Sequence, residues 1–248
     1  MSNQSKQYTQ ILLMLSHSSM TDQNEHIVIS LGGSLIVPEQ IDIDFLRSFV
    51  TLIKDYTTKG FHFVIITGGG RISRTYTLSA KEITEPTNID LDWIGIATTR
   101  LNAELVRVSF GDIAHEEILF NPEELSASHK SIIVGGGWKP GNSSDLAAVV
   151  CAEKIGAKKL INLSNIDYVY DKDPRYNPDA IKIEESSWED FCALLPKDWD
   201  PGLNSPFDPI AAKQAQALGL EVVIMNGKNI DNLKNYIDGE SFIGTVIH

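Results

Sequence analysis

Beyond the first 25 residues, hydrophobic and polar positions alternate in a regular order along the chain. Three short apolar runs, at 26–31, 61–67 and 131–134, are rich in β-branched residues, and each leads directly into glycines. Such runs are typical of strands that are buried on both faces of a sheet. Between the first two runs, apolar residues recur at helical spacing over 45–56, which predicts an amphipathic helix that ends near Gly60.

The alternation continues to the end of the chain. A further set of apolar residues lies three or four positions apart and predicts a long helix with one apolar stripe: Ile94, Ala97, Leu101, Leu105 and Val108. The pattern then predicts a helix, a strand, a helix and two strands, at 145–155, 158–163, from Asp208-Pro209 onwards, 221–225 and 241–247. Strands that alternate with helices predict the α/β fold class, a mostly parallel central sheet sandwiched between helices.

Two segments fall outside this pattern. Residues 1–25 are rich in Ser, Gln, Thr and Asn, and we expect them to form a flexible N-terminal extension. Their apolar run 11–15 follows a single Lys6 and precedes no clear cleavage site, which argues against a secretory signal. The stretch 195–206, rich in Pro, Asp, Gly and Asn, is predicted to be a long loop.

Charge and composition narrow the choice of partners. The chain of 248 residues has a formal net charge of −12, which argues against a nucleic acid or an anionic membrane surface as partner. No apolar run approaches the roughly 18 residues that a membrane-spanning helix needs, and we expect a cytoplasmic protein. Cys151 and Cys192 show no metal-binding spacing. A small phosphorylated substrate is compatible with this charge if cationic side chains gather locally.

The glycine clusters that follow the three strands carry the strongest chemical signal. We call them the first (Gly32-Gly33), second (Gly68–Gly70) and third (Gly135–Gly137) glycine turns. Ligands of open parallel sheets bind beyond the carboxyl ends of the strands, where free backbone N–H groups bind anions. The sequence contains neither the G-x-x-x-x-G-K-[ST] pattern nor G-x-G-x-x-G. The turns therefore predict phosphate binding, and disfavour a P-loop ATPase and a dinucleotide-dependent dehydrogenase.

Three segments around these turns resemble a known family. Ile29–Ser34, Gly68–Arg74 and Asp167–Pro174 together look like the amino-acid kinase superfamily, and their order and spacing look most like its archaeal-type UMP kinase branch. The resemblance implies one domain over 26–248, with an acceptor-binding half at about 26–135 and an ATP-binding half at about 136–248. It also implies transfer of the ATP γ-phosphoryl to UMP, giving UDP, with Mg²⁺ as cofactor, in a homo-oligomer that is often a hexamer.

The resemblance further implies which residues form the site. It assigns binding of the acceptor UMP to Gly69, Gly70, Arg74, Asp92, Thr99 and Ser143. It assigns binding of ATP to Gly32, Gly33, Ser164, Tyr170, Asp173 and Pro174, and catalytic roles to Ser34, Asp145 and Asp208. A guanidinium fork such as that of Arg74 suits phosphate oxygens. An open alternative is that Asp92, Asp145 and Asp208 serve only as helix N-caps. No metal ligand is assigned.

The match departs from the family at one charged position. Many members carry lysine two residues before the first glycine pair, and here that position is Ser30. Because phosphoryl transfer depends on charge stabilisation, we hypothesise that Lys139, just after the third glycine turn, supplies the missing cation. Tyr168 also replaces a glycine that is usual in the family. Two alternatives stay open: a superfamily kinase for an amino acid, carbamate or isopentenyl phosphate, and a non-catalytic nucleotide-binding relative.

Overall fold

The structure of the protein is a computed structural model that describes residues 26–126, 128–195 and 205–248. The expected N-terminal extension (1–25) and most of the expected loop at 195–206 lie outside the described residues.

The described residues form a central sheet of seven strands. Their spatial order is β3 (Ile132–Gly135), β2 (His62–Thr67), β1 (His26–Leu31), β4 (Lys159–Ser164), β8 (Glu221–Asn226), β9 (Thr245–Ile247) and β7 (Glu185–Ser186). Every neighbouring pair is parallel except β8 and β9, which are antiparallel. The predicted α/β class with a mostly parallel sheet is confirmed. The closing strand is shorter than predicted because Ile243 exchanges hydrogen bonds with the Asn232 side chain rather than with a neighbouring strand.

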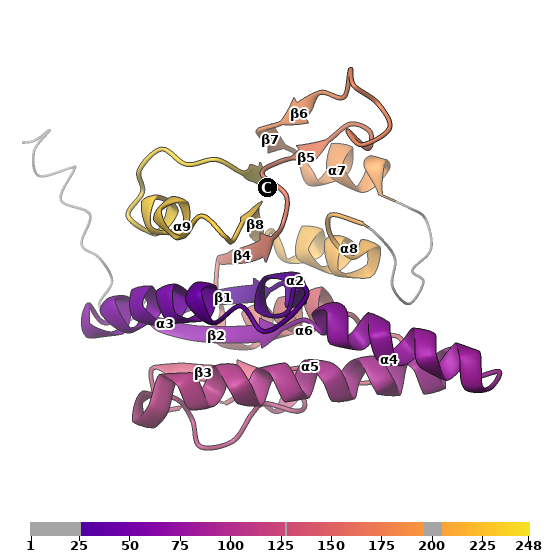
Figure 1. Ribbon diagram of the computed structural model, residues 1–248. Coiled ribbons are helices and arrows are strands. Elements are labelled where there is room, and N and C mark those ends of the chain that lie inside the picture. The colour runs from indigo at the N-terminus through magenta and orange to yellow at the C-terminus, as the bar shows by residue number, and fades with distance from the viewer. Residues whose placement is uncertain (1–25, 127, 196–204) are drawn as a thin grey trace, which may run out of the picture.

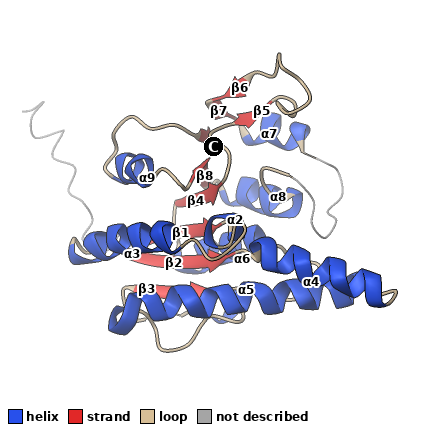
Figure 2. Cartoon of the chain, in the orientation of Figure 1, coloured by secondary structure: helices blue, strands red, loops and turns tan. Residues whose placement is uncertain are grey.

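Helices cover both faces of this sheet (Figures 1 and 2). Along β1, Ile27, Ile29 and Leu31 point to one face and Val28 to the other, as the two-residue period of a strand requires. On the first face lie α2 (Gly33–Ile36), α3 (Ile43–Thr58), α5 (Asn88–Phe110) and α9 (Ile230–Ile237). On the second lie α6 (Ser144–Ile155), α7 (Trp188–Leu194) and α8 (Pro209–Leu218). A small separate hairpin consists of β5 (Val169–Tyr170) and β6 (Lys182–Ile183).

The long helix α5 forms as predicted but buries a different face. Leu101 and Val108 of the predicted apolar stripe are 60% and 57% exposed, whereas Thr98 and Asn102 are buried. Asn102 donates to the carbonyl oxygen of Gly68, so this face of α5 packs against backbone that needs polar partners. An apolar periodicity therefore identifies the helix and misassigns its inner face.

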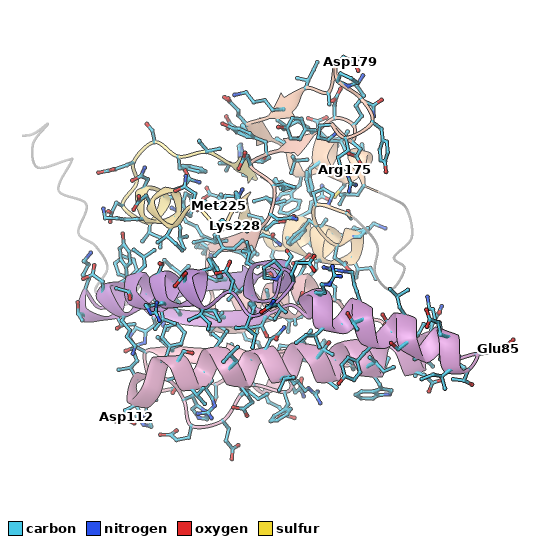
Figure 3. All side chains as sticks on the ribbon, in the orientation of Figure 1. Glu85, Asp112, Arg175, Asp179, Met225 and Lys228 are labelled. Atoms are coloured by element: carbon cyan, nitrogen blue, oxygen red, sulfur yellow. The ribbon has the colours of Figure 1, made fainter. Side chains whose placement is uncertain are left out.

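A further helix, α4 (Gly70–Ile83), pairs with the first part of α5. Figures 1 and 3 show that this helix pair extends beyond the sheet, with Glu85 at its outer end. None of the residues of α4 is buried. This helix pair forms one wall of the cavity that is described next.

Candidate active site

The first and second glycine turns contact each other through their backbones. A Cβ atom added at Gly33 would lie 2.1 Å from the nitrogen of Gly70, and one at Gly68 would lie 2.6 Å from the nitrogen of Gly33. Gly70 also has a φ of 63°, a left-handed conformation that glycine adopts readily. Any side chain here would separate the turns. The glycines are therefore required to bring the ends of β1 and β2 together.

A cavity of about 450 Å³ lies at the carboxyl ends of β1, β2 and β4. Of the residues that the sequence assigned to the site, it is lined by Gly32, Gly33, Ser34, Gly69, Gly70, Arg74, Asp92, Thr99, Ser143, Asp145 and Ser164. The location agrees with the general rule for ligands of open parallel sheets. The structure thus brings most of the predicted acceptor and donor residues to one cavity.

Asp145 is the most strongly perturbed carboxylate at this cavity among the described residues. Burial raises the pKa of its carboxyl to about 6. Its Oδ1 accepts hydrogen bonds from Ser30 Oγ and Asn162 Nδ2, both at 2.8 Å. Ser143, not Asp145, caps α6, so a capping role does not account for Asp145. Ser30 orients this carboxylate and supplies no positive charge.

Asp208 lies behind this cluster rather than in the cavity lining. Its side chain is buried and caps α8, accepting from the backbone N–H groups of Ile210 and Ala211 at 2.7 and 2.8 Å. Its own N–H donates to Asp145 Oδ2 at 3.3 Å. The capping role left open for Asp208 is therefore present, together with a backbone contact to the cavity carboxylate.

Helix α5 holds the segment that follows β3. Thr99 Oγ1 accepts from the Gly137 N–H at 2.6 Å, and Asp92 Oδ2 accepts from the Gly141 N–H at 2.7 Å. Thr87 is the N-cap of α5, which excludes capping as the role of Asp92. The second oxygen of Asp92 receives no other hydrogen bond in the described part of the chain. Asp92 can therefore hold the loop and still accept from a ligand.

Four other predicted site residues lie outside the cavity lining. Lys139 is exposed, and its ammonium lies 3.8 Å from the centre of the Trp138 ring. Tyr170 is in β5, and Asp173 forms an ion pair with Arg175 at 2.7 Å. Arg175 is on the β5–β6 side of the molecule (Figure 3). The roles assigned to Lys139 and to Tyr170, Asp173 and Pro174 stay predictions.

The cavity also contains residues that sequence reasoning missed. Thr77 and Lys81 line it from α4, three and seven positions after Arg74. Residues at this spacing share one face of a helix, so a predicted helix from Gly70 onwards would have pointed to both. Asn162 lines it from β4, inside an apolar strand with no distinctive pattern.

Two other features are absent from the described residues. These residues contain no group of three or more His, Cys, Asp or Glu side chains placed to hold a metal ion. Of the helices in the described ranges, none combines the length and apolar character that crossing a membrane demands.

The sequence and the fold of this chain are similar to those of known proteins. A sequence model of the amino acid kinase family matches residues 25–226. A uridylate kinase from Methanobrevibacter smithii is 35% identical over 89% of this chain and 98% of the relative. One from Methanosarcina mazei is 34% identical over 87% of this chain and 92% of the relative.

Two solved structures are also similar to this chain. The crystal structure of the uridylate kinase from Archaeoglobus fulgidus superimposes with a TM-score of 0.77 at 30% identity, covering 90% of this chain and 99% of that one. The UMP kinase from Bacillus anthracis, at 18% identity and a TM-score of 0.72, shares the fold. On the evidence of the matched residues and the shared fold, the chain belongs to the amino acid kinase family.

Proposed function

We propose that this protein transfers the γ-phosphoryl group of ATP to UMP, giving UDP. The observation that carries the proposal is that Arg74 and Asp92 line the same cavity as the glycine turns. Arg74 offers a fork for the acceptor phosphate, and Asp92 offers an oxygen for ribose hydroxyls. Relatives named uridylate kinases, similar over nearly the whole chain, support this acceptor.

The chemistry needs positioning more than proton transfer. The acceptor phosphate oxygen is already anionic, so no general base is required. Glycines of the first and second turns line the cavity, and their lack of side chains lets phosphoryl oxygens approach the backbone closely. Ser34 and Ser143 add hydroxyl donors at the same cavity. In this proposal, ATP phosphates lie at the first turn and the acceptor phosphate at the second.

Mg²⁺ is part of the proposal, and the donor chemistry fits it. Mg²⁺ in kinases is held by one or two carboxylates together with substrate phosphates, through oxygen ligands. Asp145 lines the cavity and would supply carboxylate oxygens of this kind, with its Oδ1 held by hydrogen bonds from Ser30 and Asn162. When bound, the ion would neutralise charge on the phosphates. The chain's own contribution is to hold the Asp145 carboxylate in a fixed orientation.

The test is a coupled assay of nucleoside diphosphate formation from ATP with a panel of acceptors. We expect turnover with UMP that exceeds turnover with AMP, acetylglutamate, carbamate or isopentenyl phosphate. Turnover with one of the other acceptors but not with UMP would identify a different kinase of the family.

A second candidate function rests on Ser30. In this chain Ser30 donates to Asp145 and leaves the phosphoryl side without the lysine that many superfamily members carry there. A non-catalytic nucleotide-binding protein would tolerate this loss. Calorimetric binding of ATP and UMP without UDP formation at any Mg²⁺ concentration would favour this candidate over the kinase.

The proposal extends to assembly and location. We place the protein in the cytoplasm, in pyrimidine nucleotide synthesis, with residues 26–135 serving mainly the acceptor and 136–248 mainly ATP.

We also propose a homo-oligomer that uses the exposed stripe of α5. In two antiparallel copies related by a two-fold axis near Ala97, Trp93 of one copy would face Leu101 of the other, because both lie four positions from Ala97. Trp93 and Leu101 are 49% and 60% exposed.

A further inference from the structure

Arg100 of α5 bonds to the third glycine turn without lining the cavity itself. Its Nε donates to the carbonyl oxygen of Gly137 at 3.1 Å, and its Nη2 donates to that of Trp138 at 3.0 Å. One planar guanidinium therefore holds two successive peptide groups. Gly137 lines the cavity, as do Asn142, Ser143 and Asp145 further along the same segment.

The surroundings of Arg100 are unusual for an arginine of this protein. Its guanidinium lies 4.9 Å from the centre of the Phe120 ring, and burial lowers its pKa. Within the described ranges no carboxylate forms an ion pair with it, whereas Arg107 on the same helix pairs with Glu104 at 2.7 Å. The charge of Arg100 is directed at backbone carbonyl oxygens, which makes these hydrogen bonds stronger than neutral ones.

The backbone of the third glycine turn packs closely against α5, near Thr99 and Arg100. A Cβ atom at Gly136 would lie 2.9 Å from the nitrogen of Arg100, and one at Gly137 would lie 2.8 Å from Thr99 Oγ1. Glycines bring no side chains that anchor the turn. Thr67 of β2 donates to the Gly135 carbonyl, whereas from Gly137 onwards the side-chain partners on α5 are Arg100 at the Gly137 and Trp138 carbonyls, Thr99 at the Gly137 N–H, and Asp92 at the Gly141 N–H.

We propose that Arg100 is a positioning residue, which fixes the segment 137–145 relative to the acceptor-binding side of the cavity. The proposal rests on the proposed function in that the affected reaction is phosphoryl transfer to UMP. Asp92 and Arg74 lie on the α4–α5 side, and Asp145 lies at the end of the segment that Arg100 holds. The rate of a reaction falls steeply when the reacting groups are displaced by about 1 Å from their productive positions. Release of the segment should lower turnover without removing any group that touches substrate.

The kinetic test compares Arg100→Ala, Arg100→Lys and the matched control Arg107→Ala. We expect kcat for UDP formation to fall about tenfold or more in both Arg100 variants, because lysine keeps the charge and loses the fork. The KM for ATP should stay within about twofold, and added guanidinium ion should restore part of the kcat of Arg100→Ala. Arg107→Ala should behave as the unmodified protein. A kcat equal to that of the unmodified protein in Arg100→Ala would overturn the proposal. Full activity in Arg100→Lys would also overturn it, because the positive charge alone would then be sufficient.

A second measurement keeps the proposal separate from the choice of acceptor. Hydrogen–deuterium exchange of the Gly137 and Gly141 amides should be faster in both Arg100 variants than in the unmodified protein and in Arg107→Ala, with the β1 and β2 amides unchanged. If UMP is not a substrate but this selective change is found, the proposed function is lost and the positioning role stands. Unchanged exchange at both glycine amides would refute the positioning role whatever the acceptor.

Discussion

Asp145 is a carboxylate whose surroundings favour its neutral form. Burial is the main cause and the nearby Asp208 carboxylate adds to it, while the Ser30 and Asn162 hydrogen bonds act in the opposite direction. The resulting pKa of about 6 lies above the ordinary value of 3.8. Between pH 4 and pH 6 the folded protein therefore binds a proton at Asp145 that the unfolded chain does not. This contribution to stability is present at low pH and is lost as the pH rises through 6.

The variant Asp145→Asn removes this titration. From pH 4 to pH 7, the free energy of unfolding of the unmodified protein should fall relative to that of the variant by up to about 3 kcal/mol. Urea titrations of both proteins across this range measure the difference, since acid effects at other sites are common to both. Parallel curves for the two proteins would contradict the raised pKa.

Single residues also show where sequence reasoning succeeds and where it stops. Arg74 and Asp92 were predicted from the resemblance to the family, Arg74 by its position after the second glycine turn, and the structure places both at the cavity. Lys81 was missed because no helix was predicted from Gly70 onwards, although a helix there places Lys81 on the same face as Arg74. The contact of Lys139 with Trp138 depends on side-chain rotamers, which spacing along the chain does not determine.

At the scale of elements, the glycine turns are packing devices as well as phosphate sites. The sequence motif suggested that glycine allows a ligand to approach the backbone. The structure adds that the first and second turns approach each other to distances that no Cβ tolerates. Helix α5 then holds the second and third turns through Asn102, Thr99 and Arg100. The buried face of α5 carries both apolar and polar residues and differs from the predicted stripe: Leu91, Ile96, Thr98, Asn102, Ala103, Val106 and Phe110 are buried, whereas Leu101 and Val108 are exposed.

A pair of glycine-to-alanine variants tests this packing. Gly33→Ala should lower the free energy of unfolding by about 1–3 kcal/mol or more, because its Cβ would lie 2.1 Å from the nitrogen of Gly70. Gly95→Ala in α5 should be neutral or stabilise by about 0.5–1 kcal/mol, since its Cβ would meet only Ser73 Oγ, at 3.7 Å. Thermal and urea unfolding compare the two. Equal effects at both sites would show that the turns do not pack as described.

For the whole molecule, the sequence predicted most of the fold but not which apolar side chains lie exposed on the surface. Buried strands that alternate with helices give a clear sequence pattern, and this pattern predicts the mostly parallel sheet that the structure shows. The strands of the β5–β6 hairpin have two residues each, and helices α7 and α9 have seven and eight, which is too short for a hydrophobic period to identify them. Whether an exposed apolar residue meets solvent or another copy is a property of assembly, which one chain's periodicity does not encode.

The exposed stripe of α5 makes a specific prediction about assembly. Leu101→Glu should reduce the molar mass measured by light scattering, because a buried charge opposite an apolar partner is unfavourable. The matched control is Ile181→Glu, at a residue that is 67% exposed and outside α5. A monomeric unmodified protein, or equal loss of mass in both variants, would contradict an interface on α5.

The proposed function requires that the cavity hold UMP with its phosphate at Arg74. The most direct measurement is steady-state kinetics of Arg74→Ala beside Arg71→Ala, its neighbour on α4, which pairs with Glu39 and does not line the cavity. We expect the KM for UMP to rise about tenfold or more in Arg74→Ala and the KM for ATP to stay within about twofold, whereas Arg71→Ala should change neither. An unchanged KM for UMP in Arg74→Ala, or an equal rise in Arg71→Ala, would contradict it.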